Sequence, residues 1–184
     1  MFPSGTRLQR DDHGCEAATV HKGTFYHFFP SKTYLLLDVM ERRVAAVDEA
    51  ILAIAAKSDA PARKVLNLFS IPQNSAGADQ PRDRVAPGFF LGNIILELAS
   101  SNPPVRAATR KALDRWTKTI AKHIIEPLLR TENLTSLQPE DAAEVVLGLL
   151  QGATIMSSAR NEPRTMRAFG HLALMLLRSE GSAS

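Results

Sequence analysis

A long amphipathic helix is the feature of this sequence that most restricts its fold. From Ser31 onward the apolar residues recur at alternating spacings of three and four, which is the period of one face of an α-helix. The positions on this face are Leu36, Met40, Val44, Val47, Ile51 and Ile54. Ser31 follows Pro30, and its hydroxyl can accept a free backbone N–H of the first turn. We therefore expect a helix that begins at Ser31 and runs to about Lys57.

Prolines, glycines and polar turns divide the rest of the chain into further helices. The expected helices run over about 62–69, 88–101, 102–127, 139–160 and 163–180. The proline-rich stretch 70–88 is expected to be a loop. Asn102 is the expected N-cap of the third of these helices, and Pro127 is expected to kink or end it. No segment alternates apolar and polar residues as a strand does, so the predicted fold class is all-α.

Composition limits the class of protein without naming a function. At 184 residues, of which 45% are apolar, the chain can bury the core of one domain, or of one domain with a small appendage. A net charge of +3 permits a polyanionic partner but does not require one. Cys15 is the only cysteine, which excludes an internal disulfide and fits a reducing compartment. With no run of about 18 apolar residues and no signal peptide, we expect a cytoplasmic protein without a membrane segment.

The sequence contains no pattern typical of an enzyme or a metal site. His13, Cys15, His21 and His27 lie close together, but their spacing matches no standard zinc pattern. The carboxylates that follow Pro139 are explained by the positive end of a helix dipole and by solvation. No nucleophile–base set and no phosphate-binding glycine loop is present. We therefore predict no catalytic residue, no metal site and no cofactor.

The segment His21–Lys32 concentrates aromatic rings and positive charge. It holds four aromatic residues in a chain with only 8 Phe, 2 Tyr and 1 Trp, and it ends in Pro-Ser-Lys. A helix that enters the DNA major groove, about 12 Å wide, needs small side chains at its tip and donors for phosphate oxygens. Gly23 and Thr24 supply the small side chains, and lysine, tyrosine and histidine supply the donors. The alternative is an aromatic turn packed in a core, with its lysines in solvent.

Val20–Lys32, which reads VHKGTFYHFFPSK, resembles the recognition helix of the tetracycline-repressor (TetR) family of transcriptional regulators. The resemblance implies an all-helical homodimer, usually a repressor, that binds a pseudo-palindromic operator and is released from it by a small-molecule ligand. It also implies which residues contact the double-stranded operator DNA. These are His21, Lys22, Gly23, Thr24, Tyr26, His27 and Lys32, with His21 expected at a base edge. The C-terminal part, including the helix around Trp116, is similar to the regulatory domain of many family members.

Two regions follow from this resemblance: a partial helix-turn-helix region over 1–32, and a helical regulatory and dimerisation domain over 33–184. The family places two more helices ahead of the recognition helix. Here Met1–Thr19 contains the helix-breaking sequences FPSG and RDDHG, so we expect a shortened or atypical support for that helix. The alternative function is a dimeric ligand-binding or interaction module that has lost efficient DNA binding.

The regulatory domain is expected to hold a small-molecule effector and a dimer interface. The expected pocket residues are Phe69, Phe89, Phe90, Asn93, Glu97, Trp116 and Ile120. Asn93 and Glu97 lie four apart on an apolar helix, either as polar contacts in the pocket or as a surface pair. The last two helices carry small residues and apolar faces, which fit packing on their own core or against a second copy, and we favour the second copy. The expected interface residues are Val145, Leu149, Gly152, Met156, Phe169, Ala173 and Leu177.

Overall fold

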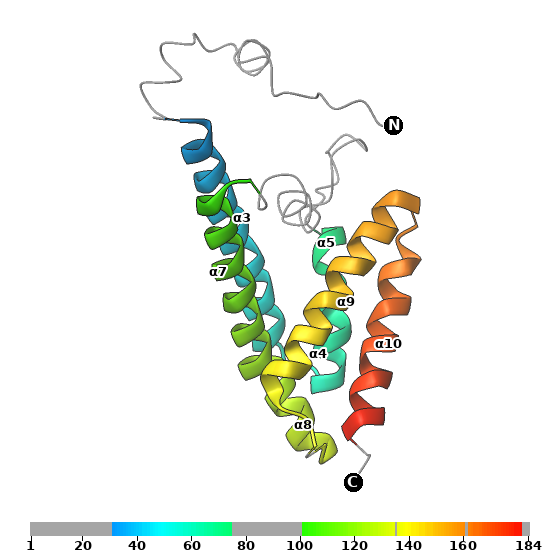
Figure 1. The fold of residues 1–184 in the computed structure, drawn as a ribbon. Coiled ribbons are helices and arrows are strands. Elements are labelled where there is room, and N and C mark those ends of the chain that lie inside the picture. The colour runs from blue at the N-terminus through cyan, green and yellow to red at the C-terminus, as the bar shows by residue number, and fades with distance from the viewer. Residues whose placement is uncertain (1–30, 75–100, 135, 161, 182–184) are drawn as a thin grey trace. The chain divides into compact units, whose positions relative to one another are not determined.

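The computed structural model describes residues 31–74, 101–134, 136–160 and 162–181 (Figure 1). The chain divides into two compact units, Met1–Val39 and Met40–Ser184. Every regular element within the described ranges is a helix, so the all-α fold class is confirmed. Nearly all of the predicted recognition helix and the predicted helix 88–101 lie outside these ranges.

α3, Lys32–Ala56, is the long helix that the apolar period predicted. Ser31 begins it as expected, because its Oγ accepts a hydrogen bond from the backbone N–H of Tyr34 at 3.1 Å. In the larger unit, one stripe of α3 is buried. The stripe consists of Met40, Val44, Asp48, Ile51 and Ile54. An acidic side chain therefore occupies the middle of an otherwise apolar face.

α4, Pro61–Leu68, follows α3 after a short corner. Lys64 crosses this corner and donates from Nζ to the backbone oxygen of Ala55 at 2.6 Å, which satisfies a carbonyl near the end of α3. α5, Ile71–Asn74, lies in the stretch that the sequence predicted to be a loop, so this part of the prediction is wrong. Ile71 is buried, and burial of this apolar side chain stabilises a helical turn that proline content alone argued against.

α7, Pro103–Ile120, begins at the predicted cap. The Oδ1 of Asn102 accepts the backbone N–H of Val105 at 3.2 Å, and two prolines follow at the first helical positions. Trp116 and Ile120 are buried, whereas Leu113 is only half-buried. The buried face of α7 turns toward α9 and toward α3, which runs beside it in Figure 1.

The helix does not end at Pro127. α7 passes into a π-helical turn, η2, Ala121–Ile125, and then into α8, Glu126–Glu132. The backbone N–H of Glu126 donates to the oxygen of Ala121, so a wider turn rearranges the hydrogen bonds just before the residue that has no N–H to donate. The expectation that this proline would end the helix is corrected accordingly; its alternative, a kink, is consistent with the change of direction between α7 and α8 in Figure 1.

α9, Pro139–Arg160, and α10, Arg164–Gly181, form an antiparallel pair (Figure 1). α9 also packs on α7 and η2, and α10 packs on α4. Close approach of α10 to α4 depends on Gly170, because a Cβ there would lie 3.3 Å from ring atoms of the buried Phe69. The pair therefore completes the core of the larger unit.

By length and composition alone, α9 is the one described helix that could cross a membrane. Core helices of soluble proteins meet the same criterion, so it is weak evidence for a membrane segment. The packing of α9 on α7, η2 and α10 is that of a core helix.

Candidate functional site

Of the residues predicted to contact DNA, one lies within the described ranges. Lys32 is exposed in the first turn of α3. The other candidates lie outside the described residues; they are His21, Lys22, Gly23, Thr24, Tyr26 and His27. The described geometry therefore concerns the regulatory domain and the helix that leads into it.

Three of the predicted effector-pocket residues are described, and all three are buried: Phe69, Trp116 and Ile120. Phe69 lies against Gly170 at the contact between α4 and α10. Trp116 donates from its indole Nε1 to the backbone oxygen of Val44 at 3.4 Å, which joins α7 to α3. The other predicted pocket residues, Phe89, Phe90, Asn93 and Glu97, lie outside the described residues.

A groove of about 430 Å³ lies between α7 and α9. Its lining combines basic side chains of α7 with the α9 carboxylates of Glu140 and Glu144. Leu113 and Leu147 give it apolar surface, and no atom lies within 4 Å of the position a Cβ would take at Gly148. The sequence predictions did not include this groove, because it depends on which faces of two distant helices meet.

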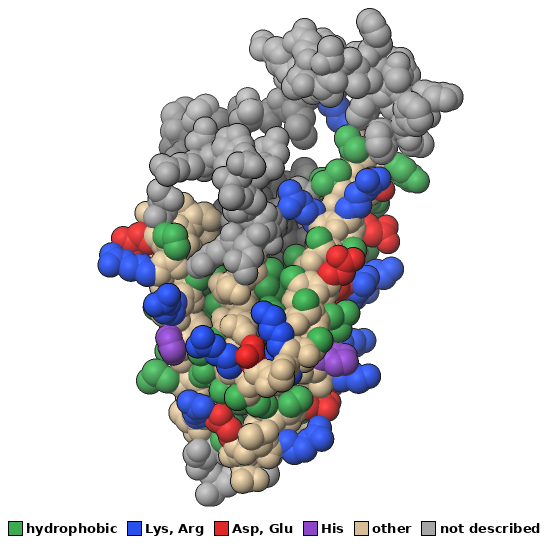
Figure 2. Space-filling view, turned by 180° about the vertical axis from the view of Figure 1, so that it is seen from behind, with side chains coloured by type: hydrophobic (Ala, Val, Ile, Leu, Met, Phe, Trp, Pro, Cys, Tyr) green, Lys and Arg blue, Asp and Glu red, His purple; other side chains and the backbone are tan. Residues whose placement is uncertain are grey.

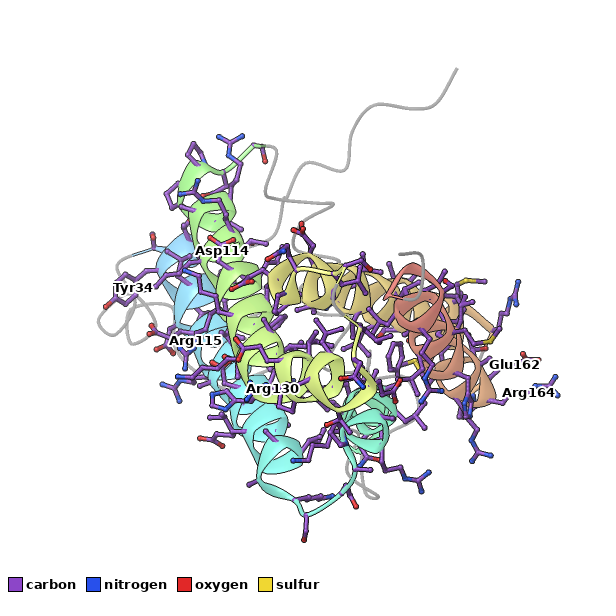
Figure 3. The ribbon with its side chains drawn as sticks, turned by 90° about the horizontal axis from the view of Figure 1, so that it is seen from below. Tyr34, Asp114, Arg115, Arg130, Glu162 and Arg164 are labelled. Atoms are coloured by element: carbon purple, nitrogen blue, oxygen red, sulfur yellow. The ribbon has the colours of Figure 1, made fainter. Side chains whose placement is uncertain are left out.

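The buried carboxylate of Asp48 on α3 pairs with the guanidinium of Arg115 on α7, next in sequence to Trp116. Figure 3 labels Arg115 on α7. Burial raises the pKa of Asp48, and the charge and hydrogen bond of Arg115 oppose that rise. Among the described residues, Oδ1 of this carboxylate has no hydrogen-bond partner. Sequence reasoning missed the pair, although an aspartate on the apolar stripe of α3 was the available signal.

Large apolar side chains are exposed mainly on the last two helices. Five of the seven such residues belong to α9 and α10: Val145, Ile155, Leu172, Met175 and Leu176. Within the described ranges, no atom lies within 4 Å of the position a Cβ would take at Gly152. We call these exposed apolar residues of the helix pair, together with Gly152, the α9–α10 face.

The predicted interface residues are divided between this face and the core. Val145 is exposed. Four others are half-buried: Leu149, Gly152, Met156 and Phe169. Ala173 and Leu177 are buried in the core of their own subunit, so they are not available to a second chain. Both sides of α10 are apolar in sequence, so the sequence alone did not separate its buried residues from its exposed ones.

Known proteins resemble this chain in sequence and in fold. Residues 76–171 match a family described as "Transcriptional regulator LmrA/YxaF-like, C-terminal domain". The HTH-type transcriptional repressor DhaR of Mycobacterium sp. (strain GP1) is 26% identical over 147 residues, which cover 79% of this chain and 70% of that protein. The crystal structure of regulatory protein TetR from Rhodobacter sphaeroides superposes with a TM-score of 0.73 at 23% identity, over 88% of this chain and 84% of that one.

The described part of the chain combines the long helix α3 with a C-terminal helix pair that exposes apolar side chains, and its fold is similar to that of the TetR structure. The family match covers more than half of the chain. The chain therefore belongs to the TetR family of transcriptional regulators. The resemblance that the segment Val20–Lys32 indicated is confirmed at the level of the family.

Proposed function

We propose that this protein represses transcription by binding operator DNA as a homodimer, and that a small-molecule ligand releases it. The observation that carries the proposal is the segment Val20–Lys32, whose TetR-like sequence leads directly into the capped start of α3. Lys22, Tyr26 and His27 would donate to phosphate oxygens, and the small residues between them would let the backbone approach the bases. The name of the relative DhaR, a transcriptional repressor, supports repression.

The proposed dimer interface is the α9–α10 face. Two copies of this helix pair would form a four-helix bundle and cover the exposed Leu172, Met175 and Leu176 of each chain. The open surface at Gly152 would let the helices of the two chains approach closely. Such a dimer would offer one recognition helix to each half-site, about one helical turn apart.

Release by a ligand would act through α3. Trp116 and Arg115, adjacent on α7, contact Val44 and Asp48, one turn apart on α3. A ligand that binds among α3, α7 and the predicted helix 88–101 would shift α3 against α7 and change the affinity for DNA. Such coupling between two sites is typically about 1–3 kcal/mol.

A regulator of this kind acts in the cytoplasm and requires no catalytic chemistry of its own. Among the described residues, no group of three or more His, Cys, Asp or Glu side chains is placed to hold a metal ion. Its proposed partners are operator DNA, a second copy of the chain and an effector molecule.

A gel-shift titration with the DNA upstream of the chain's own gene tests the proposal. We expect specific, nanomolar retardation that weakens steeply with salt, and a salt slope reduced by about 1 per protomer in Lys22→Ala. Lys57→Ala, which removes an exposed lysine at the end of α3, is the matched control and should bind as the wild type does. Weak binding that ignores sequence would instead favour a dimeric ligand-binding module that no longer recognises an operator.

A further inference from the structure

The outer flank of α7 is a depression of about 570 Å³ lined by basic side chains. Arg110, Lys111, Arg115 and Lys118 line it, with Asp114 as the one carboxylate. From the first to the last of these cations the helix rises roughly 12 Å, at about 1.5 Å per residue. The volume lies in the range of small-molecule sites, roughly 300–1,000 Å³. None of the predicted effector-pocket residues lines this depression.

Three of the four cations of this flank form no ion pair within the part of the chain that the structure describes. Arg110, Lys111 and Lys118 make no ion pair or side-chain hydrogen bond there, whereas three arginines elsewhere each pair with a glutamate. The face shown in Figure 2 is different, because acidic and basic side chains lie among one another on it. A bound anion would relieve the mutual repulsion of the cations on α7.

Arg115 connects this flank to the core. Its Nε faces Oδ2 of Asp48, its side chain is 56% exposed, and no described contact uses its terminal nitrogens. Among the described residues, Arg115 is the one charged group that lowers the pKa of Asp48, against the effect of burial. An anion that binds this guanidinium therefore shares it with a buried carboxylate that has no other counter-ion.

We propose that the α7 flank is a binding site for a small polyvalent anion with phosphate or carboxylate groups. Lys111, Arg115 and Lys118 would hold the anion, and the anion would compete with Asp48 for Arg115. The site is distinct from the operator contacts and from the effector pocket, so its existence does not depend on the proposed function.

Competition for Arg115 has a measurable consequence. When the guanidinium turns toward the anion, the carboxylate of Asp48 remains buried without a counter-charge, and a buried carboxylate favours its protonated form. Anion binding should therefore be accompanied by proton uptake and should strengthen as the pH falls. A simple attraction between the anion and surface lysines predicts no such linkage.

The test is isothermal titration calorimetry of the full chain with myo-inositol hexasulfate, a compact polyanion whose own charge is constant near neutral pH. Titrations in two buffers of different protonation enthalpy report the protons taken up. We expect proton uptake with the wild type, and none with Asp48→Asn. The same variant should bind roughly tenfold more tightly at neutral pH, because the competing charge-assisted hydrogen bond is gone.

A pair of double variants separates the site from general charge attraction. Lys111→Gln/Lys118→Gln should weaken binding by about tenfold or more, whereas Lys57→Gln/Arg63→Gln, which removes the same charge from exposed positions elsewhere, should not. Equal weakening in both would overturn the proposal, and so would proton uptake that persists in Asp48→Asn.

Two competition arms identify the source of the anion. Displacement of hexasulfate by tripolyphosphate assigns the site to phosphate ligands, and displacement by propane-1,2,3-tricarboxylate assigns it to polycarboxylates. Either result supports the site. Displacement by neither, or binding of duplex DNA of unrelated sequence at this flank without binding of hexasulfate, contradicts it.

Discussion

Asp48 and Arg115 form an ion pair whose two members differ in exposure: the aspartate side chain is 5% exposed and the arginine side chain 56%. Removing one partner is therefore not equivalent to removing the other. An arginine left alone can be solvated where it stands, but a carboxylate left alone stays buried in the apolar stripe of α3.

Arg115→Gln should destabilise the protein at pH 7 by about 3 kcal/mol, the lower end of the range for broken buried pairs, because the arginine is itself half exposed. Asp48→Asn should change the free energy of unfolding by less than about 1 kcal/mol. Urea unfolding of the two variants measures both effects. Equal losses in the two variants would show that the pair behaves as a symmetric surface contact.

The contribution of Asp48 to the stability of the folded protein depends on pH in a definite direction. Burial raises its pKa in the folded state, so its contribution to stability is fully present below the unfolded value, about 3.9, and is lost as the pH rises through the folded value. Arg115→Gln removes the charge that opposes this rise in pKa. The free energy of unfolding that this variant loses relative to the wild type should therefore become smaller as the pH falls from 7 toward 5. Unfolding midpoints across this range provide the measurement, and a deficit independent of pH would contradict the assignment.

The stability that Glu132 contributes depends on pH in the opposite direction. The bidentate hydrogen bonds from Arg178, both at 2.7 Å, lower the pKa of this carboxyl and join α8 to α10. The stability they give is present above the unfolded pKa, about 4.3, and is lost as the pH falls through the folded value. Glu132→Gln should cost about 1 kcal/mol at pH 7, since Arg178 is half exposed. Glu144→Gln on the exposed side of α9 is the control and should cost almost nothing.

The glycines of the last two helices should respond differently to substitution. At Gly170 any side chain meets the ring of Phe69, which is 2% exposed and cannot move aside, so Gly170→Val should destabilise by about 1–3 kcal/mol. At Gly148 no atom lies within 4 Å, so Gly148→Ala should gain about 0.5–1 kcal/mol from helix propensity. Thermal unfolding of both variants distinguishes a packed glycine from an open one, and similar values at the two positions would be inconsistent with this packing.

Leu172→Glu/Leu176→Glu should convert the proposed dimer into a folded monomer, because it places two charges in each copy of the α9–α10 face. Leu52→Glu changes an equally exposed leucine on α3 and should leave the dimer intact. Light scattering after size-exclusion chromatography gives the mass of each variant. An unchanged mass for the α10 variant would place the interface elsewhere.

Local signals in the sequence were sufficient to predict most helices. Ser31, Asn102 and Pro139 each begin a helix where the sequence predicted one, because caps and prolines act through neighbouring backbone groups. The turn at Ile71 was not predicted, since it depends on burial in the assembled core. The π-helical turn before Pro127 was not predicted either, because a missing N–H can be accommodated in several ways.

For the candidate site, the features that the sequence could not predict are mainly contacts between distant segments. Arg115 and Asp48 lie on different helices, and their pairing follows only from the packing of α7 on α3. The same limit explains Ala173 and Leu177: α10 is apolar on nearly every side, so its sequence does not distinguish the core side from the exposed side.

A hydroxyl-radical footprint on the DNA upstream of the chain's own gene tests the central claim most directly. For a dimeric regulator we expect two symmetric protected segments with centres about one helical turn apart, both lost together in Leu172→Glu/Leu176→Glu. A single protected segment, or a footprint that the α10 variant leaves unchanged, would contradict the account.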